Sequence, residues 1–210
     1  MTMTDDSKLQ PLVADAFDSL AGLLEGATER QWDTPSMCAG WRVREVTAHM
    51  TMAARYSEEE FMAGLQRCGF DFTTFSEEIA AQDGGLPAAE LVANLRSDVM
   101  RHWAPPGGGY HGALSHVVIH GLDISEPLGV PRRCSDDAIR VVLDGLTESG
   151  VQTHFGVGIS GRALQATDLD WSCGSGAALR GPAADLVLAL CGRVVPGGRL
   201  EGEPLAASAG

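Results

Sequence analysis

Two histidines four residues apart are the feature that most restricts how this chain can fold. His116 and His120 stand in the segment Ser115–Asp123, with only β-branched residues between them. In a strand the two histidines would lie roughly 13 Å apart, at ~3.3 Å per residue, which is too far to act on one small ion. In a helix they lie one above the other on the same face. A helix is therefore the reading with chemical consequences, and two structural core histidines are the alternative.

A third histidine, His49, belongs to a second predicted helix, over about residues 42–65. Val46, Ala53 and Tyr56 stand at −3, +4 and +7 from it, so His49 lies on the apolar face of that helix. A buried imidazole needs a polar partner, which can be a neighbouring carbonyl group or a metal ion. Taken alone, His49 fits a structural core residue better than a ligand, but the paired histidines make a set of three available.

Three histidines from two helices of one bundle can form a metal site. Bundles build such sites from side chains that project inward across facing helices, and three protein ligands leave one coordination position open, as in catalytic zinc sites. Imidazole also suits nickel, iron, manganese and cobalt. Histidine ligands usually need an acceptor at the second ring nitrogen, and Asp123 and Glu45 are the nearest candidates. Pairing of these carboxylates with nearby arginines is the alternative.

Composition excludes several classes of function. The net charge is −13, and Lys8 is the only lysine, so no basic cluster is available to bind nucleic acid. No apolar run approaches the 18 residues of a membrane span, and the N-terminus lacks a signal pattern, so we expect a soluble cytoplasmic protein. The five cysteines form no CxxC motif, which argues against a disulfide framework or a zinc knuckle.

Hydrophobic periodicity predicts an α+β chain in two domains. Helices are expected over about residues 5–25, 42–65, 87–102, 110–124 and 135–150, joined by short connections as in an antiparallel bundle, while residues 68–83 look less regular. From residue 154 onward we expect strands at 163–170 and 171–179, a helix from Gly181 to Cys191, a strand at 199–201 and a disordered tail. The predicted boundary separates a bundle of residues 1–153 from a small domain of residues 154–210.

Several motifs occur in an order that resembles one known family. The first part contains Trp32–Ser36, then Cys38–Val43 leading to His49, then His116–Ile124 and Pro127–Gly129. The C-terminal part contains Trp171, Gly174–Gly176, Gly181–Leu186 and the pair Gly192–Arg193. In this order the sequence is similar to the mycothiol-dependent maleylpyruvate isomerase family, within the DinB-like metalloprotein fold.

The resemblance implies an N-terminal DinB-like four-helix bundle that binds a divalent metal, usually zinc, and a C-terminal α/β domain related to sterol carrier proteins. It implies that His49, His116 and His120 are the metal ligands, although the family's isomerase has a glutamate where this chain has His116. The expected activity is that of an S-transferase or isomerase, in which a metal-bound thiolate of mycothiol attacks a small electrophile. By its place in the Gly-Arg pair, Arg193 would bind a substrate carboxylate, with a surface ion pair as the alternative.

Two other functions fit the same residues. A metal-stabilised bundle could bind a ligand or a protein partner without turnover, because fold does not determine function. A metal-dependent hydrolase could use bound hydroxide at the open position. The expected partners are mycothiol and the electrophile, with no nucleic acid and no membrane, and the expected state is a monomer or weak homodimer. Trp41 and Tyr56 are candidates to line the pocket, with core packing as the alternative.

Overall fold

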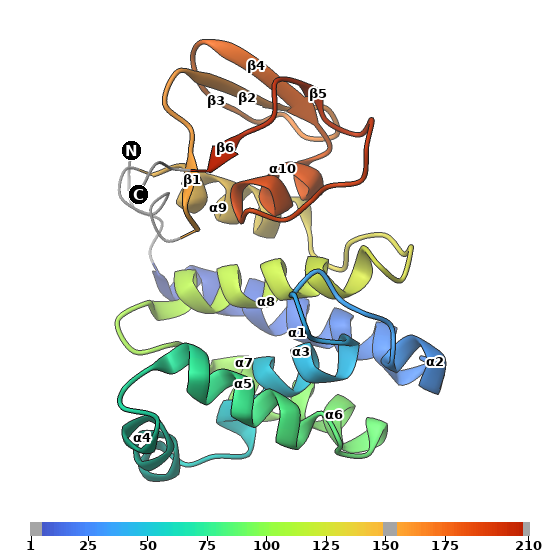
Figure 1. Ribbon diagram of the computed structural model, residues 1–210, viewed down its shortest axis with the longest axis vertical. Helices are drawn as coiled ribbons and strands as arrows, with labels where there is room; N and C mark the ends of the chain where they lie inside the picture. Colours follow the sequence, from blue (N-terminus) through green and yellow to red (C-terminus); the bar gives the residue numbers. More distant parts are fainter. Residues whose placement is uncertain (1–5, 149–154, 208–210) are drawn as a thin grey trace. The chain divides into compact units, whose positions relative to one another are not determined.

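The computed structural model describes residues 6–148 and 155–207 and divides the chain into two compact units, Met1–Arg133 and Cys134–Gly210 (Figure 1). The first unit is helical, and the second combines two helices with small sheets. The α+β class predicted from the sequence is therefore confirmed. Within the described ranges, no helix has the length and apolar character needed to span a membrane.

The helical unit is organised around α1 and α8. Helix α1 packs against α6, α7 and α8, and α3 packs against α5, α6 and α8. Helix α8 has the predicted position, and α1 follows a short 3₁₀ turn and ends at a C-capping Gly26. The helices of this unit are α1 Gln10–Glu25, α2 Glu29–Trp32, α3 Val43–Met50, α4 Glu58–Arg67, α5 Phe72–Asp83, α6 Ala88–Leu95, α7 Asp98–His102 and α8 Gly109–Ser125.

The prediction of a single helix over residues 42–65 is wrong, because the first helix of this region, α3, ends at Met50 and a second begins at Glu58. A 3₁₀ turn, η2 (Met52–Ala54), separates α3 from α4. The guanidinium of Arg55 donates to the backbone oxygens of Ala48 and Thr51, at the end of α3. Ser57 then starts α4 with a capping box, in which its hydroxyl accepts from the backbone N–H of Glu60. Local capping interactions thus divide the helix, although the apolar pattern continues through the division.

Two further helical expectations are corrected. The stretch that looked irregular contains α5, whose first turn is capped by the Asp71 carboxylate through the N–H groups of Thr73 and Thr74. The helix predicted from Pro87 to residue 102 is divided into α6 and α7. Ser97 caps α7 by accepting from the backbone N–H of Met100, and so begins a new helix.

In the second unit one helix, α10, packs against a small mixed sheet, and a second helix, α9, packs against α10. The sheet has the order β3-β2-β4-β5, with β2 and β4 parallel and Leu164 opposite Leu179, where two longer strands had been predicted. Helix α10 contacts β2, β4 and α9. The elements are α9 Asp136–Thr147, β1 Val157–Gly158, β2 Arg162–Ala166, β3 Ser172–Gly174, β4 Ala177–Gly181, α10 Ala183–Leu190, β5 Glu201–Gly202 and β6 Ala206–Ala207.

The division between the units differs from the predicted one. The predicted boundary after residue 153 lies outside the described residues, and the compact units divide after Arg133. Helix α9 therefore belongs to the second unit, because it packs against α10. Within the predicted disordered tail, Ala206–Ala207 instead form strand β6, which pairs with β1, and residues 208–210 lie outside the described part of the chain.

Candidate metal centre

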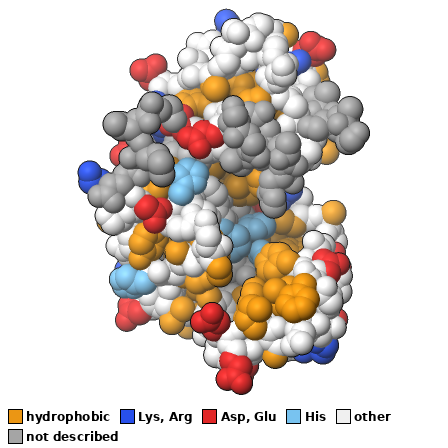
Figure 2. Space-filling view, turned by 90° about the vertical axis from the view of Figure 1, so that its left-hand side faces the viewer, with side chains coloured by type: hydrophobic (Ala, Val, Ile, Leu, Met, Phe, Trp, Pro, Cys, Tyr) orange, Lys and Arg blue, Asp and Glu red, His pale blue; other side chains and the backbone are white. Residues whose placement is uncertain are grey.

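The structure brings together all three histidines predicted to bind metal. His49 comes from the last turn of α3, and His116 and His120 come from one face of α8. Their ring centroids are 4.9 to 5.2 Å apart, and one nitrogen of each ring lies within 4.8 Å of the other two. Histidine side chains reach the surface beside a group of hydrophobic side chains (Figure 2). The spacing of four on α8 accounts for the pair, and the contact between α3 and α8 supplies the third ring.

The spacing between two ring nitrogens fits a shared cation. The Nε2 atoms of His49 and His116 are 3.2 Å apart. Two nitrogens bound to one tetrahedral zinc ion at about 2.0–2.1 Å would lie roughly 3.3 Å apart. A direct hydrogen bond between the two rings has the same length, so this distance alone does not distinguish the two arrangements. The nitrogen chemistry of the set is nevertheless that of a zinc ligand set.

Two of the three rings have a polar partner at the nitrogen that faces away from the cluster. The Nδ1 of His120 lies 3.0 Å from the Asp123 Oδ2, and the Nδ1 of His49 lies 2.8 Å from the Ser76 Oγ. A protonated Nδ1 that donates to these oxygens leaves Nε2 with a free lone pair, which is the tautomer that a metal needs. Asp123 was anticipated from the sequence. Ser76 was missed because its segment, α5, was not predicted to be helical.

Glu45, the other carboxylate considered as a ring acceptor, is engaged elsewhere. It accepts from the backbone N–H of Arg42 at 2.8 Å and from the guanidinium of the same residue. Burial works against ionisation of Glu45, but these bonds to Arg42 lower its pKa overall. The expected alternative, pairing with a nearby arginine, is therefore the correct one for Glu45.

His116 is the ring without a described second partner. Its Nδ1 is buried and makes no hydrogen bond within the described part of the chain. Burial, reinforced by repulsion from His120 and His49, lowers the pKa of His116 well below its ordinary value. Burial and then His120 lower the pKa of His49 to about 3. Both rings are therefore neutral at pH 7, as ligands must be.

A fourth side chain beside the cluster, Cys38, was not assigned a place from the sequence. Its thiol donates to the Asp123 Oδ2 at 3.1 Å and lies 3.7 Å from the Nδ1 of His120. The loop that carries Cys38 is tied to α8, because the backbone N–H of Met37 donates to the backbone oxygen of Asp123. Cys38 thus contacts both the His120 ring and its acceptor, Asp123.

Cys38→Ser is expected to retain bound metal and activity, because a serine hydroxyl can also donate to Asp123 and no reacting sulfur is needed from the chain. The measurement is metal stoichiometry by mass spectrometry together with thiol-transfer rate. Cys191→Ser serves as the comparison at a buried cysteine of the second unit. An inactive Cys38→Ser protein that remains folded would identify the cysteine as a direct participant.

The two neutral rings predict a loss of stability in mild acid for the metal-free protein. An unfolded histidine gains a proton below about pH 6.5, whereas His49 and His116 stay neutral when folded, so stability falls as pH drops below that value. The expected loss is about 1.4 kcal/mol per histidine at pH 5.5, where carboxylates in the unfolded chain are still largely ionised. Urea unfolding at pH 7.5 and 5.5 measures it. His49→Gln should remove about half of the difference, and an unchanged midpoint would contradict the lowered pKa values.

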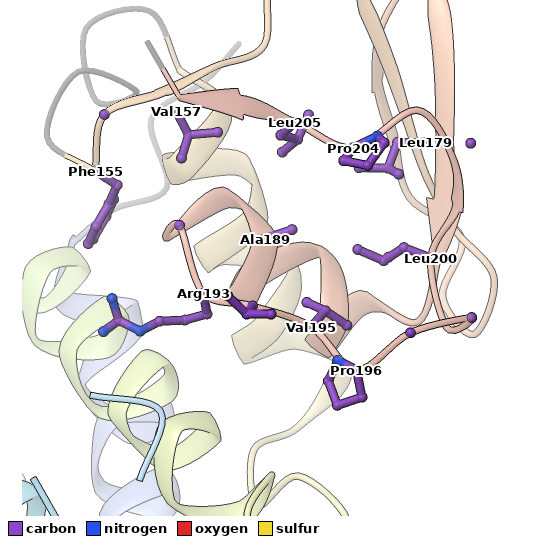
Figure 3. Close-up of a pocket in the computed structure, with 16 residues that line it drawn as sticks. Phe155, Val157, Leu179, Ala189, Arg193, Val195, Pro196, Leu200, Pro204 and Leu205 are labelled. Carbon is purple, nitrogen blue, oxygen red and sulfur yellow. The ribbon is translucent and has the colours of Figure 1, made fainter. Parts of the chain in front are cut away.

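Arg193 and Tyr56, also singled out from the sequence, lie outside the histidine cluster of the helical unit. Arg193 follows α10 in the second unit, where its guanidinium donates to the Cys191 backbone oxygen at 3.2 Å. It borders a cavity of about 600 Å³ whose other labelled residues are mainly aliphatic (Figure 3). Tyr56 packs on the cluster of Met52, Phe75 and Ile79, so the core alternative is correct for it.

Part of the helical unit matches a known protein family. Residues 13–104 match the model of a family described as the mycothiol maleylpyruvate isomerase N-terminal domain. The matched segment is less than half of the chain. It contains α3 with His49 but ends before α8, so the match does not extend to His116 and His120. No curated protein matches the chain.

Solved structures give the same fold over nearly the whole chain. A crystal structure of the mycothiol-dependent maleylpyruvate isomerase in a histidine-to-alanine mutant aligns with a TM-score of 0.57 and 14% identity, covering 96% of each chain. The crystal structure of the mycothiol-dependent maleylpyruvate isomerase aligns with a TM-score of 0.55 and 14% identity, covering 95% of this chain and 93% of that one. At this identity the likeness concerns the fold, which extends beyond the family match into the second unit.

Proposed function

We propose that this chain is a metal-dependent enzyme that uses mycothiol as thiol cosubstrate to modify or isomerise a small electrophile. The observation that carries the proposal is the convergence of three imidazoles, two of them neutral at pH 7, with Asp123 and Ser76 at the outward nitrogens of two rings. The family of residues 13–104 and the fold of the two isomerase structures support the choice of thiol.

His49, His116 and His120 would hold the ion through nitrogen, and zinc suits this ligand set. When bound, a divalent ion lowers the pKa of a thiol that enters its open position, so that the thiol is ionised near neutral pH. The protein's own contribution is the Asp123 carboxylate, which accepts a hydrogen bond from Nδ1–H of His120 and so leaves Nε2 of that ring as the ligand atom. With an ionised thiol no general base is required.

Arg193 is proposed to bind a carboxylate of a substrate, since a guanidinium can hold a carboxylate through two parallel hydrogen bonds. Arg193→Gln should then raise KM for an electrophile that carries a carboxylate and leave KM unchanged for its uncharged ester. A structural role in its own unit would change both KM values or neither.

The test separates this proposal from the two alternatives. Protein substituted with cobalt is titrated with mycothiol while its visible spectrum is recorded, and a panel of electrophiles is incubated with and without mycothiol for mass spectrometry. A thiol-dependent spectral change together with a thiol conjugate or a thiol-dependent isomer supports the proposal. Hydrolysis that needs no mycothiol identifies a hydrolase, and metal binding with neither spectral change nor product identifies a non-catalytic protein.

A further inference from the structure

Aromatic rings from three different segments surround the histidine cluster. The ring of Trp41 lies 5.1 Å from that of His49, Trp103 lies 5.1 Å from His116, and Phe72 lies 6.3 Å from His49, measured between centroids. Trp41 precedes α3, Phe72 is the first residue of α5, and Trp103 follows α7. We refer to Trp41, Phe72 and Trp103 as the aromatic rim.

The residues of the aromatic rim are not fully buried. Trp41 and Trp103 are half-buried, and Phe72 is 49% exposed. Outside the rim, the ring of Phe61 lies 6.3 Å from that of Phe72, between centroids, and packs edge-on against the fully buried Phe75. Phe72 thus packs against Phe61, while about half of its own surface is exposed to solvent. Exposed apolar surface next to a polar cluster is typical of a ligand-binding surface.

Charge around the histidines points in the same direction. The segments that supply the three rings and the rim, residues 41–57, 72–83, 98–103 and 109–125, contain four arginines and no lysine. Each of these arginines is paired with a carboxylate: Arg42 and Arg44 with Asp33, Arg55 with Asp83 and Arg101 with Asp18. The described part of these segments therefore offers a substrate aromatic faces and no unpaired cation.

From this combination we infer that the electrophile carries an aromatic group, which the rim binds beside the reacting carbon. Aromatic pairs contribute more than their buried area alone, through offset or edge-to-face contacts at centroid distances of about 4.5–7 Å. The inference rests on the proposed function for the reaction, but the binding preference can be measured without turnover. It distinguishes an aryl substrate from a small dicarboxylate, for which the rim supplies no binding charge.

A matched pair of electrophiles tests the inference. 4-Phenylbut-3-en-2-one and pent-3-en-2-one share one enone and differ only in phenyl against methyl. Their dissociation constants are measured by ligand-observed NMR on the purified protein without thiol, so that no reaction occurs. We expect the phenyl compound to bind at least about tenfold more tightly. Equal dissociation constants for the two enones would overturn the inference.

Variants then assign the preference to the rim. Phe72→Ala should weaken binding of the phenyl compound about fivefold without changing that of the methyl compound, and Phe72→Tyr should restore it. Phe70→Ala is the matched control, because Phe70 is 64% exposed and has no described ring contact with the histidines. Equal weakening by both alanine variants would contradict a role for the Phe72 ring.

The reaction gives a separate result. If the proposed function holds, mycothiol adds to the enone: its sulfur bonds to the β-carbon and its proton goes to the α-carbon. Rates are divided by the uncatalysed rate for each enone, and the phenyl compound should have the lower KM. If no electrophile gave either a thiol conjugate or a thiol-dependent isomer, the proposed function would be rejected, while the binding preference measured above would stand.

Discussion

Replacement of any one of His49, His116 and His120 by alanine is expected to abolish stoichiometric metal binding and, with it, any thiol-dependent activity. Each ring supplies one nitrogen to the group whose ligand atoms lie within 4.8 Å of one another, and no other described His, Cys, Asp or Glu joins all three. The two imidazoles that remain form an incomplete set for zinc, which takes three protein ligands in catalytic sites. The measurement is metal per protein by inductively coupled plasma mass spectrometry after dialysis.

His102→Ala is the matched control for these variants. This ring is exposed, and its Nδ1 bonds to the backbone oxygen of Asp98 in its own helix. It should keep full metal content and activity. Circular dichroism and urea unfolding show whether each variant is folded, and His49→Gln provides a second replacement at the buried position. Full metal content in two of the three ligand variants would show that the histidines are core residues and not a metal centre.

The parts of the centre that could be predicted from the sequence are those fixed by local geometry. A spacing of four residues places His116 and His120 on one face of any helix, and the apolar neighbours of His49 place it on an inward face. Asp123 lies three residues after His120, within the reach that a helix allows between side chains. These relations need no knowledge of the tertiary structure.

The parts that were missed depend on contacts between distant segments. Ser76 meets His49 only because α5 packs on α3, and Cys38 meets Asp123 only because its loop is tied to α8. The break after α3 depends on where the guanidinium of Arg55 goes, which periodicity does not reveal. The spacing of Ser57 and Glu60 is, however, typical of a capping box and indicates the start of a new helix. The continuous apolar pattern of residues 42–65 conceals this local signal.

Asp123→Asn is expected to weaken metal binding by about 10- to 100-fold, the range typical for loss of an outer acceptor of a histidine ligand. The Asp123 carboxylate is fully buried and takes hydrogen bonds from both the His120 ring and the Cys38 thiol at one oxygen. A neutral amide of the same size is a weaker acceptor, and an amide nitrogen turned toward His120 would favour the tautomer with the proton on Nε2. The change is therefore electrostatic and involves little loss of volume.

Glu45→Gln is the matched control for this prediction, because Glu45 is a buried carboxylate on the helix that carries His49 and is the other candidate acceptor in the sequence. Its carboxylate bonds to Arg42 and caps α3, so its replacement should reduce stability and leave metal affinity unchanged. Affinity is measured by competition with a chromophoric chelator, and stability by urea unfolding of the metal-free proteins. Equal losses of affinity in both variants would mean that the carboxylates act through the stability of the helices and that Asp123 does not orient His120.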